Sequence, residues 1–329
     1  MKTQQLCAEG FTQRLEERYQ ALYRSGEMSL SKNYSDKFPL LEHCLREAVR
    51  GKSVLDFGCG PGRLSLMLAR WSARVHGMDF APAGIELAGL LAQVTETRNV
   101  SFSVGDVSTL AAMDRTYEVA VLAGVLEHCP EPVRMLRSLC KVLTPDGLLV
   151  VQSPSFANFR GDAYNTLLNL LKLPMSLTDL FQVTPRHIAS WAQELDLTLE
   201  RVVGGHYALG YLERVLDDFR QRIPAAARDA GVSEQCRFDQ FFSWMQDRIE
   251  ENRLLIEHAA RLGLLKPVPP SAPLSAKRPP KIDNGLWTSV STYLTYDGWR
   301  EPYYSDTSPW CYLGASATYL LRKSRGGRG

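Results

Sequence analysis

The sequence contains no long apolar run, and this absence excludes a protein that spans a membrane with helices. No stretch reaches the roughly 18 consecutive apolar residues that a spanning helix needs. Residues 1–20 carry charges where a signal peptide needs an unbroken apolar segment. We therefore expect a cytoplasmic protein without a membrane partner.

Cysteine pairs, metal motifs and a strong net charge are also missing. The seven cysteines are scattered and odd in number, which favours reduced thiols over a disulfide framework. Neither a CxxC nor an HExxH motif is present, so no metal site is predicted. The formal charge of +2 gives no basis for nucleic-acid binding by the whole protein, and we interpret the basic tail 322–329 as a solvated chain end.

The chain is long enough to hold more than one unit. Its 329 residues, 45% hydrophobic and 22% charged, are typical of a globular protein with one large domain and an insertion, or with two domains. We expect N-terminal helices over 1–50, a cofactor-binding domain over 51–208, an inserted helical and aromatic cap over 209–311, and a final strand with the basic tail over 312–329.

Short runs rich in β-branched residues alternate with helical periodicity from Val54 onward. The expected strands are 54–57, 74–79, 100–105, 118–124, 147–154, 197–205 and 312–323. The expected connecting helices are 62–71, 83–94 and 131–143, with a further helix beginning at Thr184 and Pro185. This alternation predicts an α/β fold in which a doubly wound parallel sheet has helices on both faces.

Helical periodicity also precedes and follows this region. Leading helices are expected within 8–24 and 38–51, and a long helical block is expected over about 209–264. The proline-rich run 266–281 cannot form a regular helix or a central strand, so we interpret it as a linker or as a segment that wraps around the domain.

A glycine-rich turn follows the first of these strands. Gly58, Gly60 and Gly62 lie between an apolar strand and an amphipathic helix, where free backbone N–H groups and the helix dipole suit a polar or anionic ligand. A dinucleotide fingerprint needs its third glycine one residue later, at Arg63. The loop by itself is also compatible with a purely structural turn.

Three carboxylates lie where successive strands end, so the topology places them at one edge of the sheet. Asp56 is suited to a ligand ammonium group, and Asp79 to both hydroxyls of a ribose. Asp106 can accept a hydrogen bond from an exocyclic amine, with Val107 offering backbone and apolar contacts. Together with the glycine loop, these residues predict a nucleoside-binding cleft.

At these residues the sequence resembles the class I S-adenosylmethionine-dependent methyltransferases. The stretches VLDFGCGPG, GMDFAP and GDV carry the resemblance, which covers residues 34–154, and LEHCPEPVRMLRSLCKVLTPDGLLVVQSP is similar to the ubiquinone-type O-methyltransferases. The resemblance implies a Rossmann-like seven-stranded sheet with an antiparallel last strand, S-adenosyl-L-methionine as cofactor and a small-molecule acceptor.

The resemblance also assigns cofactor contacts to individual residues. Gly58, Cys59 and Gly60 would line the methionine moiety, and Asp79 would bind the ribose. The remaining contacts that it implies are Phe80 beside the adenine, Ala123 with its backbone near the sulfonium, and Tyr34 closing over the cofactor.

The acceptor pocket is expected over the carboxyl edge of the last parallel strands. Residues 155–183 and the insertion between Gly210 and Cys311 emerge there. The second half of the insertion is rich in aromatic residues that suit a flat or cationic substrate or, alternatively, attach the cap to the sheet domain. These aromatic residues are Trp287, Tyr293, Tyr296, Trp299, Tyr303, Tyr304, Trp310 and Tyr312.

Two histidines are candidates for a catalytic base. His128 follows the fourth strand, where an imidazole could take the proton of the acceptor, although a cofactor contact or a helix cap explains it equally well. His206 follows the sixth strand at the same edge, where the alternative is a satisfied polar residue in a turn. Glu127 is a further candidate for binding the acceptor, or simply a charge near a helix N-terminus.

The function that these features favour is methylation of an oxygen or nitrogen atom of a small molecule. Methylation of tRNA or protein is the first alternative, and the near-neutral charge argues against the RNA form. A regulatory protein that binds the cofactor without catalysis is the second, and folding alone does not require the carboxylates of Asp56, Asp79 and Asp106 in one cleft. A monomer and a homodimer both remain open.

Overall fold

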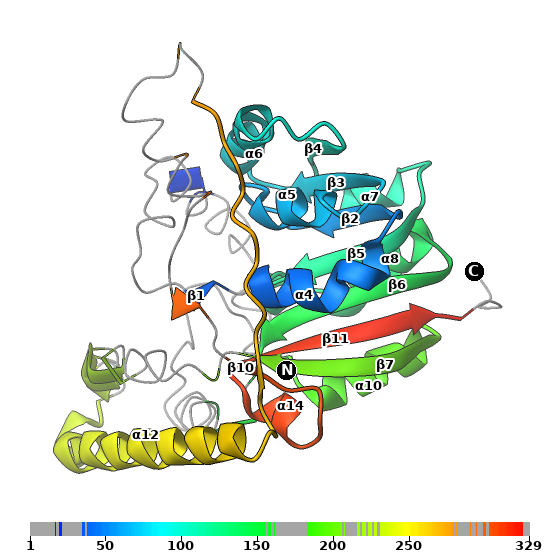
Figure 1. The fold of residues 1–329 in the computed structure, drawn as a ribbon. Helices are drawn as coiled ribbons and strands as arrows, with labels where there is room; N and C mark the ends of the chain where they lie inside the picture. Colours follow the sequence, from blue (N-terminus) through cyan, green and yellow to red (C-terminus); the bar gives the residue numbers. More distant parts are fainter. Residues whose placement is uncertain are drawn as a thin grey trace.

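A computed structural model gives the fold of the chain (Figure 1). It describes four long continuous stretches and several shorter pieces between them. The long stretches are residues 38–155, 183–205, 231–278 and 303–324.

A seven-stranded sheet forms the centre of the molecule, in the order β4-β3-β2-β5-β6-β11-β7. Its strands are β2 (Ser53–Phe57), β3 (Arg74–Asp79), β4 (Val100–Val104), β5 (Tyr117–Ala123), β6 (Leu143–Pro154), β7 (Leu197–Gly205) and β11 (Ser316–Lys323). The pairs β2–β3, β3–β4, β2–β5 and β5–β6 are parallel, whereas β11 is antiparallel to both β6 and β7. The predicted Rossmann-like fold with an antiparallel last strand is confirmed.

Helices cover both faces of this sheet, as doubly wound connections require (Figure 1). They are α4 (Phe38–Val49), α5 (Arg63–Ala69), α6 (Pro82–Val94), α7 (Val107–Ala111), α8 (Pro132–Val142) and α10 (Pro185–Glu194). The short helix α7 was not anticipated from the sequence. Thr184 is the N-cap of α10 as predicted, and its hydroxyl accepts a hydrogen bond from the His187 N–H at 3.3 Å.

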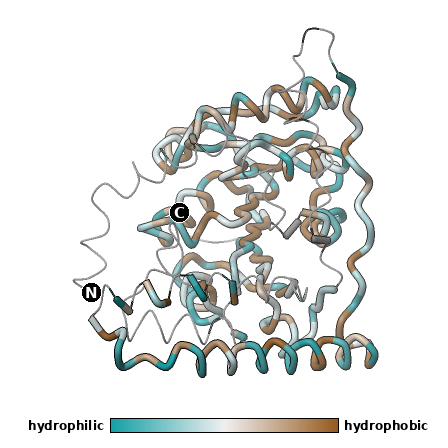
Figure 2. The backbone as a smooth tube through the Cα atoms, turned by 90° about the vertical axis from the view of Figure 1, so that its left-hand side faces the viewer, coloured by the Kyte–Doolittle hydropathy of each residue, from teal (hydrophilic) through white to brown (hydrophobic). Residues whose placement is uncertain are grey.

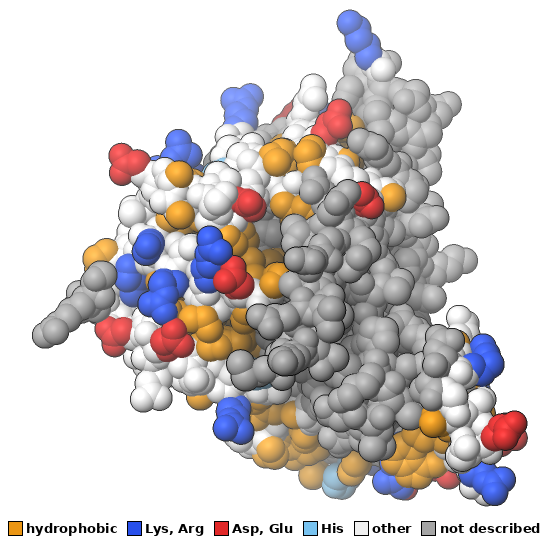
Figure 3. All heavy atoms as spheres, turned by 180° about the vertical axis from the view of Figure 1, so that it is seen from behind, with side chains coloured by type: hydrophobic (Ala, Val, Ile, Leu, Met, Phe, Trp, Pro, Cys, Tyr) orange, Lys and Arg blue, Asp and Glu red, His pale blue; other side chains and the backbone are white. Residues whose placement is uncertain are grey.

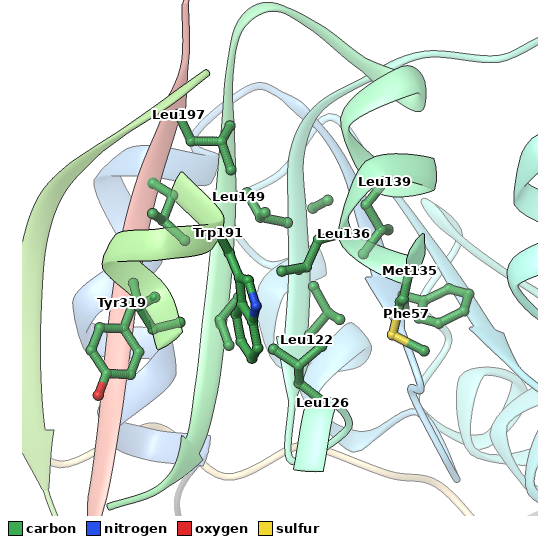
Figure 4. Close-up of a cluster of buried hydrophobic side chains, with 14 of the residues drawn as sticks. Phe57, Leu122, Leu126, Met135, Leu136, Leu139, Leu149, Trp191, Leu197 and Tyr319 are labelled. Carbon is green, nitrogen blue, oxygen red and sulfur yellow. The ribbon is translucent and has the colours of Figure 1, made fainter. Parts of the chain in front are cut away.

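Two apolar layers hold the helices to the sheet. On one face, residues of α4 and α5 such as Leu45 and Leu68 pack against alternate residues of the strands. On the other face, Leu136 of α8 and Trp191 of α10 pack against Leu149 (Figure 4). Side chains of a strand point alternately to the two faces, so consecutive residues of β6 belong to different layers.

The turn that leads into the final part of β6 uses a left-handed residue. Asp146 has φ 63°, a conformation in which an aspartate is tolerated. The turn therefore needs no second glycine before Gly147, because Asp146 adopts the left-handed conformation itself. Strand β6 begins at Leu143, four residues before the predicted strand, because the residues ahead of this turn already pair with β5.

The proline-rich run wraps around the sheet domain as one of the two interpretations expected. The buried carboxylate of Glu42 on α4 accepts hydrogen bonds from the Trp71 indole at 2.9 Å and from the Ser271 hydroxyl. Farther along the run, the Lys277 N–H donates to the Val94 carbonyl at 2.9 Å. The run therefore crosses from α4 to the end of α6 as an extended strap.

Shorter elements complete the described chain. They are β1 (Ser35–Asp36), η1 (Leu126–His128), η2 (Ser233–Gln235), α12 (Phe238–Arg261), β8 (Lys266–Pro267), β9 (Trp299–Arg300), β10 (Tyr303–Tyr304) and α14 (Trp310–Leu313). Strand β1 pairs with β9, and β8 pairs with β10. Among the described residues, no helix is both long enough and apolar enough to cross a bilayer.

A buried histidine network gives the stability of this fold a predictable dependence on pH. The two ring nitrogens of His76 lie 2.5 Å from the Tyr117 hydroxyl and 2.8 Å from the Ser103 hydroxyl. Burial, and secondarily the charge of Arg115, lowers the pKa of His76. His76 therefore stays neutral in the folded state at a pH where it binds a proton in the unfolded chain.

We expect acid to destabilise the wild type more than a His76→Gln variant. Below the unfolded pKa of about 6.5, the unfolded chain binds the extra proton, so the free energy of unfolding falls with pH by up to about 1.4 kcal/mol per unit. Urea unfolding at pH 7.5 and 5.5, followed by circular dichroism, measures both proteins. The contribution of every other titrating group cancels in the comparison, and parallel pH profiles would contradict the assignment.

Candidate functional site

The predicted site residues lie at the carboxyl edge of β2, β3, β4 and β5, which are neighbours in the sheet. The loop after β2 connects directly to α5, and Gly58, Gly60 and Gly62 all have positive φ, between 52° and 77°. A residue with a Cβ atom is strained in this conformation, so three glycines in alternation allow the tight turn. The loop brings the end of β2 against the end of β3.

The amides of this loop point inward, which differs from the expectation of free N–H groups. Gly58 and Cys59 donate to the Met78 carbonyl at 2.7 and 3.1 Å, and Gly60 donates to Asp79 Oδ2 at 2.8 Å. These three N–H groups are therefore engaged by β3. The physical reason is the close approach of β3, whose Met78 carbonyl and Asp79 carboxylate take the donors that the sequence alone left open.

The inward amides bear on which cofactor the loop fits. A dinucleotide places its pyrophosphate on free backbone N–H groups of such a loop. The first three N–H groups of this loop already donate to β3 and are not free. S-adenosylmethionine carries no phosphate, and its ammonium, hydroxyl and amine groups are donors that call for carboxylates. The acids retained at the strand ends suit these donor groups, whereas a pyrophosphate would find no free N–H at Gly58, Cys59 or Gly60.

Asp79 is the residue that fastens the loop to β3. Its side chain is 5% exposed, and its second oxygen, Oδ1, accepts from the Ala81 N–H at 2.9 Å. Burial raises the pKa of Asp79, while the two backbone hydrogen bonds oppose that rise. Each carboxylate oxygen has more than one lone pair, so the ribose role remains compatible with these bonds.

The other two acids also have structural partners. Asp56 is 1% exposed, and its Oδ2 accepts from the Ser65 hydroxyl of α5 at 2.6 Å. Asp106 is the N-cap of α7, and its Oδ1 accepts from the amides of Ser108 and Thr109 at 2.9 and 3.1 Å. Hydrogen bonds from Ser108, above all from its hydroxyl, lower the pKa of Asp106 and keep it ionised. This capping role was not predicted.

The remaining residues predicted to contact the cofactor are Cys59, Phe80, Val107, Ala123 and Tyr34. The Cys59 side chain is buried and points toward β3, because a Cβ atom placed on Gly77 would lie 2.9 Å from the Cys59 sulfur. Cys59 could therefore line a ligand only with its backbone. Burial raises the pKa of the Cys59 thiol well above its usual value. Phe80, Val107 and Ala123 are half-buried at the edge. Tyr34 lies outside the described residues.

Of the two histidines predicted as catalytic bases, only His128 lies in the described part of the chain. His128 closes the short helix η1 directly after β5 and is half-buried. Its backbone N–H donates to the Val125 carbonyl at 3.0 Å. Glu127 is 4% exposed, and its carboxylate accepts from the Ser153 hydroxyl at 3.1 Å. His206 lies outside the described residues, so its role stays a prediction.

Sequence reasoning missed Gln152, which lies beside Ala123 in the sheet. It is 4% exposed, and its Oε1 has no hydrogen-bond partner among the described residues. The backbone carbonyl of Gln152 accepts from the Gly124 N–H at 2.8 Å, which ties it to the end of β5. A lone glutamine in the apolar run GLLVVQSP was the available signal, because a buried amide needs a partner.

The aromatic residues of the insertion are described in part. Tyr304 is buried with Leu40 and Val203, and its hydroxyl lies 3.2 Å from His43 Nε2. Trp310 and Tyr303 pack against a cluster around Tyr207, and Tyr312 packs against the layer below α8. Tyr304 therefore attaches the insertion to the sheet domain, Tyr303 and Trp310 pack in a cluster that joins Tyr207 to residues of the insertion, and Tyr312 lies just after the insertion. The other four, Trp287, Tyr293, Tyr296 and Trp299, have side chains outside the description.

Comparison with known proteins gives a family for this arrangement. Residues 48–214, about half of the chain, match a methyltransferase domain family. The chain is 30% identical over 165 residues to a ubiquinone biosynthesis O-methyltransferase of Coxiella burnetii (strain RSA 331 / Henzerling II), which covers 48% of this chain and 69% of that protein. The corresponding Proteus mirabilis (strain HI4320) enzyme is 31% identical over 164 residues, with 48% and 65% covered.

A solved structure with a similar fold is the magnesium protoporphyrin IX methyltransferase of Synechocystis PCC 6803 with bound S-adenosylhomocysteine. It has a TM-score of 0.42 and 21% sequence identity, and the match covers 50% of this chain and 74% of that one. The family match covers the glycine loop and the strands from β2 to β7. The chain therefore belongs to the methyltransferase domain family and is an S-adenosylmethionine-dependent methyltransferase.

Proposed function

We propose that this methyltransferase transfers the methyl group to an oxygen or nitrogen atom of a small molecule. The observation that carries the proposal is Gln152, a buried amide near the carboxyl edge of β6 whose Oε1 has no hydrogen-bond partner in the described part of the chain. An unpaired buried acceptor costs free energy, about 1–3 kcal/mol, unless a ligand donates to it. A hydroxyl or amine of the acceptor molecule is such a donor.

The placement of Gln152 supports this role. It neighbours Ala123, whose backbone lies near the sulfonium according to the sequence resemblance, so a group bound by Gln152 lies close to the methyl position. The curated relatives are O-methyltransferases of ubiquinone biosynthesis, which agrees with an oxygen acceptor. The formal charge of +2 offers few phosphate contacts, which disfavours tRNA as the acceptor.

The chemistry assigned to the chain is mostly positioning. When bound, S-adenosylmethionine supplies a methyl group on a positively charged sulfur. The glycine loop and Asp79 would hold the cofactor, and Gln152 would orient the acceptor for an in-line approach, which accounts for much of the rate of such a transfer. His128, at the end of β5, would take the proton that the acceptor loses.

The assay that tests this function measures methyl transfer to free small molecules. Purified full-length protein is incubated with S-adenosylmethionine carrying a ¹³C-methyl group and a panel of catechols, phenols, carboxylic acids and amines. We expect S-adenosylhomocysteine and one labelled acceptor by mass spectrometry. Label found only in added tRNA or protein, or cofactor binding by calorimetry without any transfer to the panel, contradicts the proposal.

The same assay decides the role of His128. We expect His128→Ala to lower kcat by about 100-fold or more, because general-base catalysis contributes about that much, while cofactor affinity is unchanged. Raising the pH should recover part of the rate for a phenolic acceptor, which ionises without a base. A variant with wild-type kcat removes His128 as the base, and His187→Ala, in the first turn of α10, is the control histidine.

A further inference from the structure

Helix α12 carries a stripe of exposed and half-buried side chains that no other described element covers. Its buried side faces the molecule through Met245, Ile249 and Ile256. About one-quarter turn away lie Trp244 and Leu255, which are 45% and 58% exposed. Single exposed apolar residues are ordinary, but two on one side of one helix, with the half-buried Phe241 beside them, indicate an interaction surface.

The stripe has the spacing of a coiled-coil seam. Its positions are separated alternately by three and four residues, which keeps them on one side of an α-helix. We call these positions the seam: Phe241, Trp244, Arg248, Glu251, Leu255 and His258. The two central positions are charged with opposite signs, and the positions outside them are aromatic or apolar up to His258.

The seam is complementary to itself when it is reversed. The helix runs from Phe238 to Arg261, and turning it about its midpoint exchanges these two ends. The same rotation places Trp244 opposite Leu255 and Arg248 opposite Glu251. An isologous contact between two identical copies requires this self-complementarity, in which each pair occurs twice around a two-fold axis.

The central charges are available for such a contact. The side chains of Arg248 and Glu251 are 39% and 52% exposed, and within one chain they form an ion pair three residues apart. Another ion pair with the same spacing, Glu250 to Arg253 at 3.5 Å, lies on α12 outside the seam. In an antiparallel pair of helices, Arg248 would also face the Glu251 of the second copy.

The position of α12 in the molecule leaves room for a second copy. The helix forms one margin of the protein in two views that differ by a quarter turn (Figures 1 and 2). From behind, hydrophobic side chains lie between charged ones along that same margin (Figure 3). No described element covers the outer side of the helix in these views.

From these observations we propose that two copies of this chain pair through α12 in an antiparallel arrangement centred between Ile249 and Glu250. A membrane surface fits less well. The helix carries five acidic residues and three arginines, and anionic lipids favour basic amphipathic helices. The tryptophan and arginine of the seam are residue types enriched in protein–protein contacts.

Charge reversal in the full-length protein tests the pairing. Analytical ultracentrifugation over micromolar to millimolar concentrations should show a dimer for the wild type. Arg248→Glu and Glu251→Arg should each raise the dimer Kd by on the order of 100-fold, since like charges then meet twice across the axis. The double variant Arg248→Glu/Glu251→Arg restores opposite charges and should recover the dimer.

A matched control separates pairing from helix stability. Arg253→Glu removes the Glu250 ion pair, which has the same three-residue spacing on the same helix but lies outside the seam. We expect it to stay dimeric, with circular dichroism showing equal helix content in all variants. A monomeric wild type, equal Kd values for the Arg248→Glu and Arg253→Glu variants, or a monomer that sediments with phosphatidylglycerol vesicles would overturn the proposal.

Discussion

Substitution of Asp79 by alanine is expected to weaken the binding of S-adenosylhomocysteine by on the order of 100-fold and to destabilise the protein without ligand. The buried carboxylate accepts from Gly60 and Ala81, at 2.8 and 2.9 Å. Alanine leaves both buried N–H groups unpaired, which costs about 1–3 kcal/mol each, and removes the proposed acceptor for the ribose hydroxyls. Calorimetry measures the affinity, and thermal unfolding measures the stability.

A comparison of ligands distinguishes the two roles of Asp79. Methylthioadenosine has the ribose but lacks the amino-acid end that the glycine loop would line. If Asp79 binds the ribose, Asp79→Ala weakens this ligand as much as S-adenosylhomocysteine. If it only fastens the loop, methylthioadenosine binds as it does to the wild type and the ribose assignment is wrong. Asp114→Ala, at an exposed aspartate between α7 and β5, is the control and should leave both affinities unchanged.

Asp79→Asn gives a graded version of the same experiment. The amide has the shape of the carboxylate and keeps one acceptor oxygen, so it can satisfy one of the two backbone N–H groups. Its NH₂ group faces the other N–H, which leaves that donor without an acceptor. We therefore expect the stability and the affinity of Asp79→Asn to lie between those of wild type and Asp79→Ala.

The regular part of the fold was predictable because its signals are local. Strand β3 at Arg74–Asp79 and strand β7 at Leu197–Gly205 have the expected bounds, since alternation of β-branched runs with helical periodicity reports burial directly. The N-cap at Thr184 followed from residue type and the next proline. Helix α7, with five residues, is too short for a periodic pattern to reveal.

The chemistry of the site was predictable only in part, because it depends on contacts between distant segments. The residue types at Asp56, Asp79 and Asp106 were identified, but each also bonds to protein groups that only the folded chain brings near. The direction of the amides at Gly58 and Cys59 depends on the Met78 carbonyl, some 20 residues away in the sequence. A glycine pattern indicates that a tight turn is allowed, but it does not indicate in which direction the backbone N–H groups of the turn point.

The packing of one aromatic ring against two glycines gives the second large effect. A Cβ on Gly77 would lie 2.5 Å from Phe102 Cδ1 and 2.9 Å from Cys59 Sγ. Gly77 is in β3, held between β2 and β4, so the backbone has little freedom to move away. A Cβ on Gly62 would lie 2.6 Å from Phe102 Cζ, and Gly62 also has φ 77°.

We expect Gly77→Ala to cost about 1–3 kcal/mol from overpacking, and Gly62→Ala to cost about 1–2 kcal/mol more because of its left-handed backbone. Both should also lower cofactor affinity, since they displace the loop. Combination with Phe102→Leu, which shortens the ring, separates the two causes. Urea unfolding should show recovery of most of the cost for Gly77→Ala, whereas Gly62→Ala retains its conformational part.

The two double-mutant cycles are informative because the glycines share one neighbour and differ in backbone conformation. If Phe102 is the obstacle, each pair of substitutions is less destabilising than the sum of its single effects. Strictly additive effects at Gly77 would mean that Cys59 or the backbone bears the strain instead, and a Cys59→Ala partner then tests that contact. If Phe102→Leu restores the free energy of unfolding equally for Gly77→Ala and Gly62→Ala, Gly62→Ala has no conformational cost. The positive φ values of the loop would then not be the reason that the loop requires glycine.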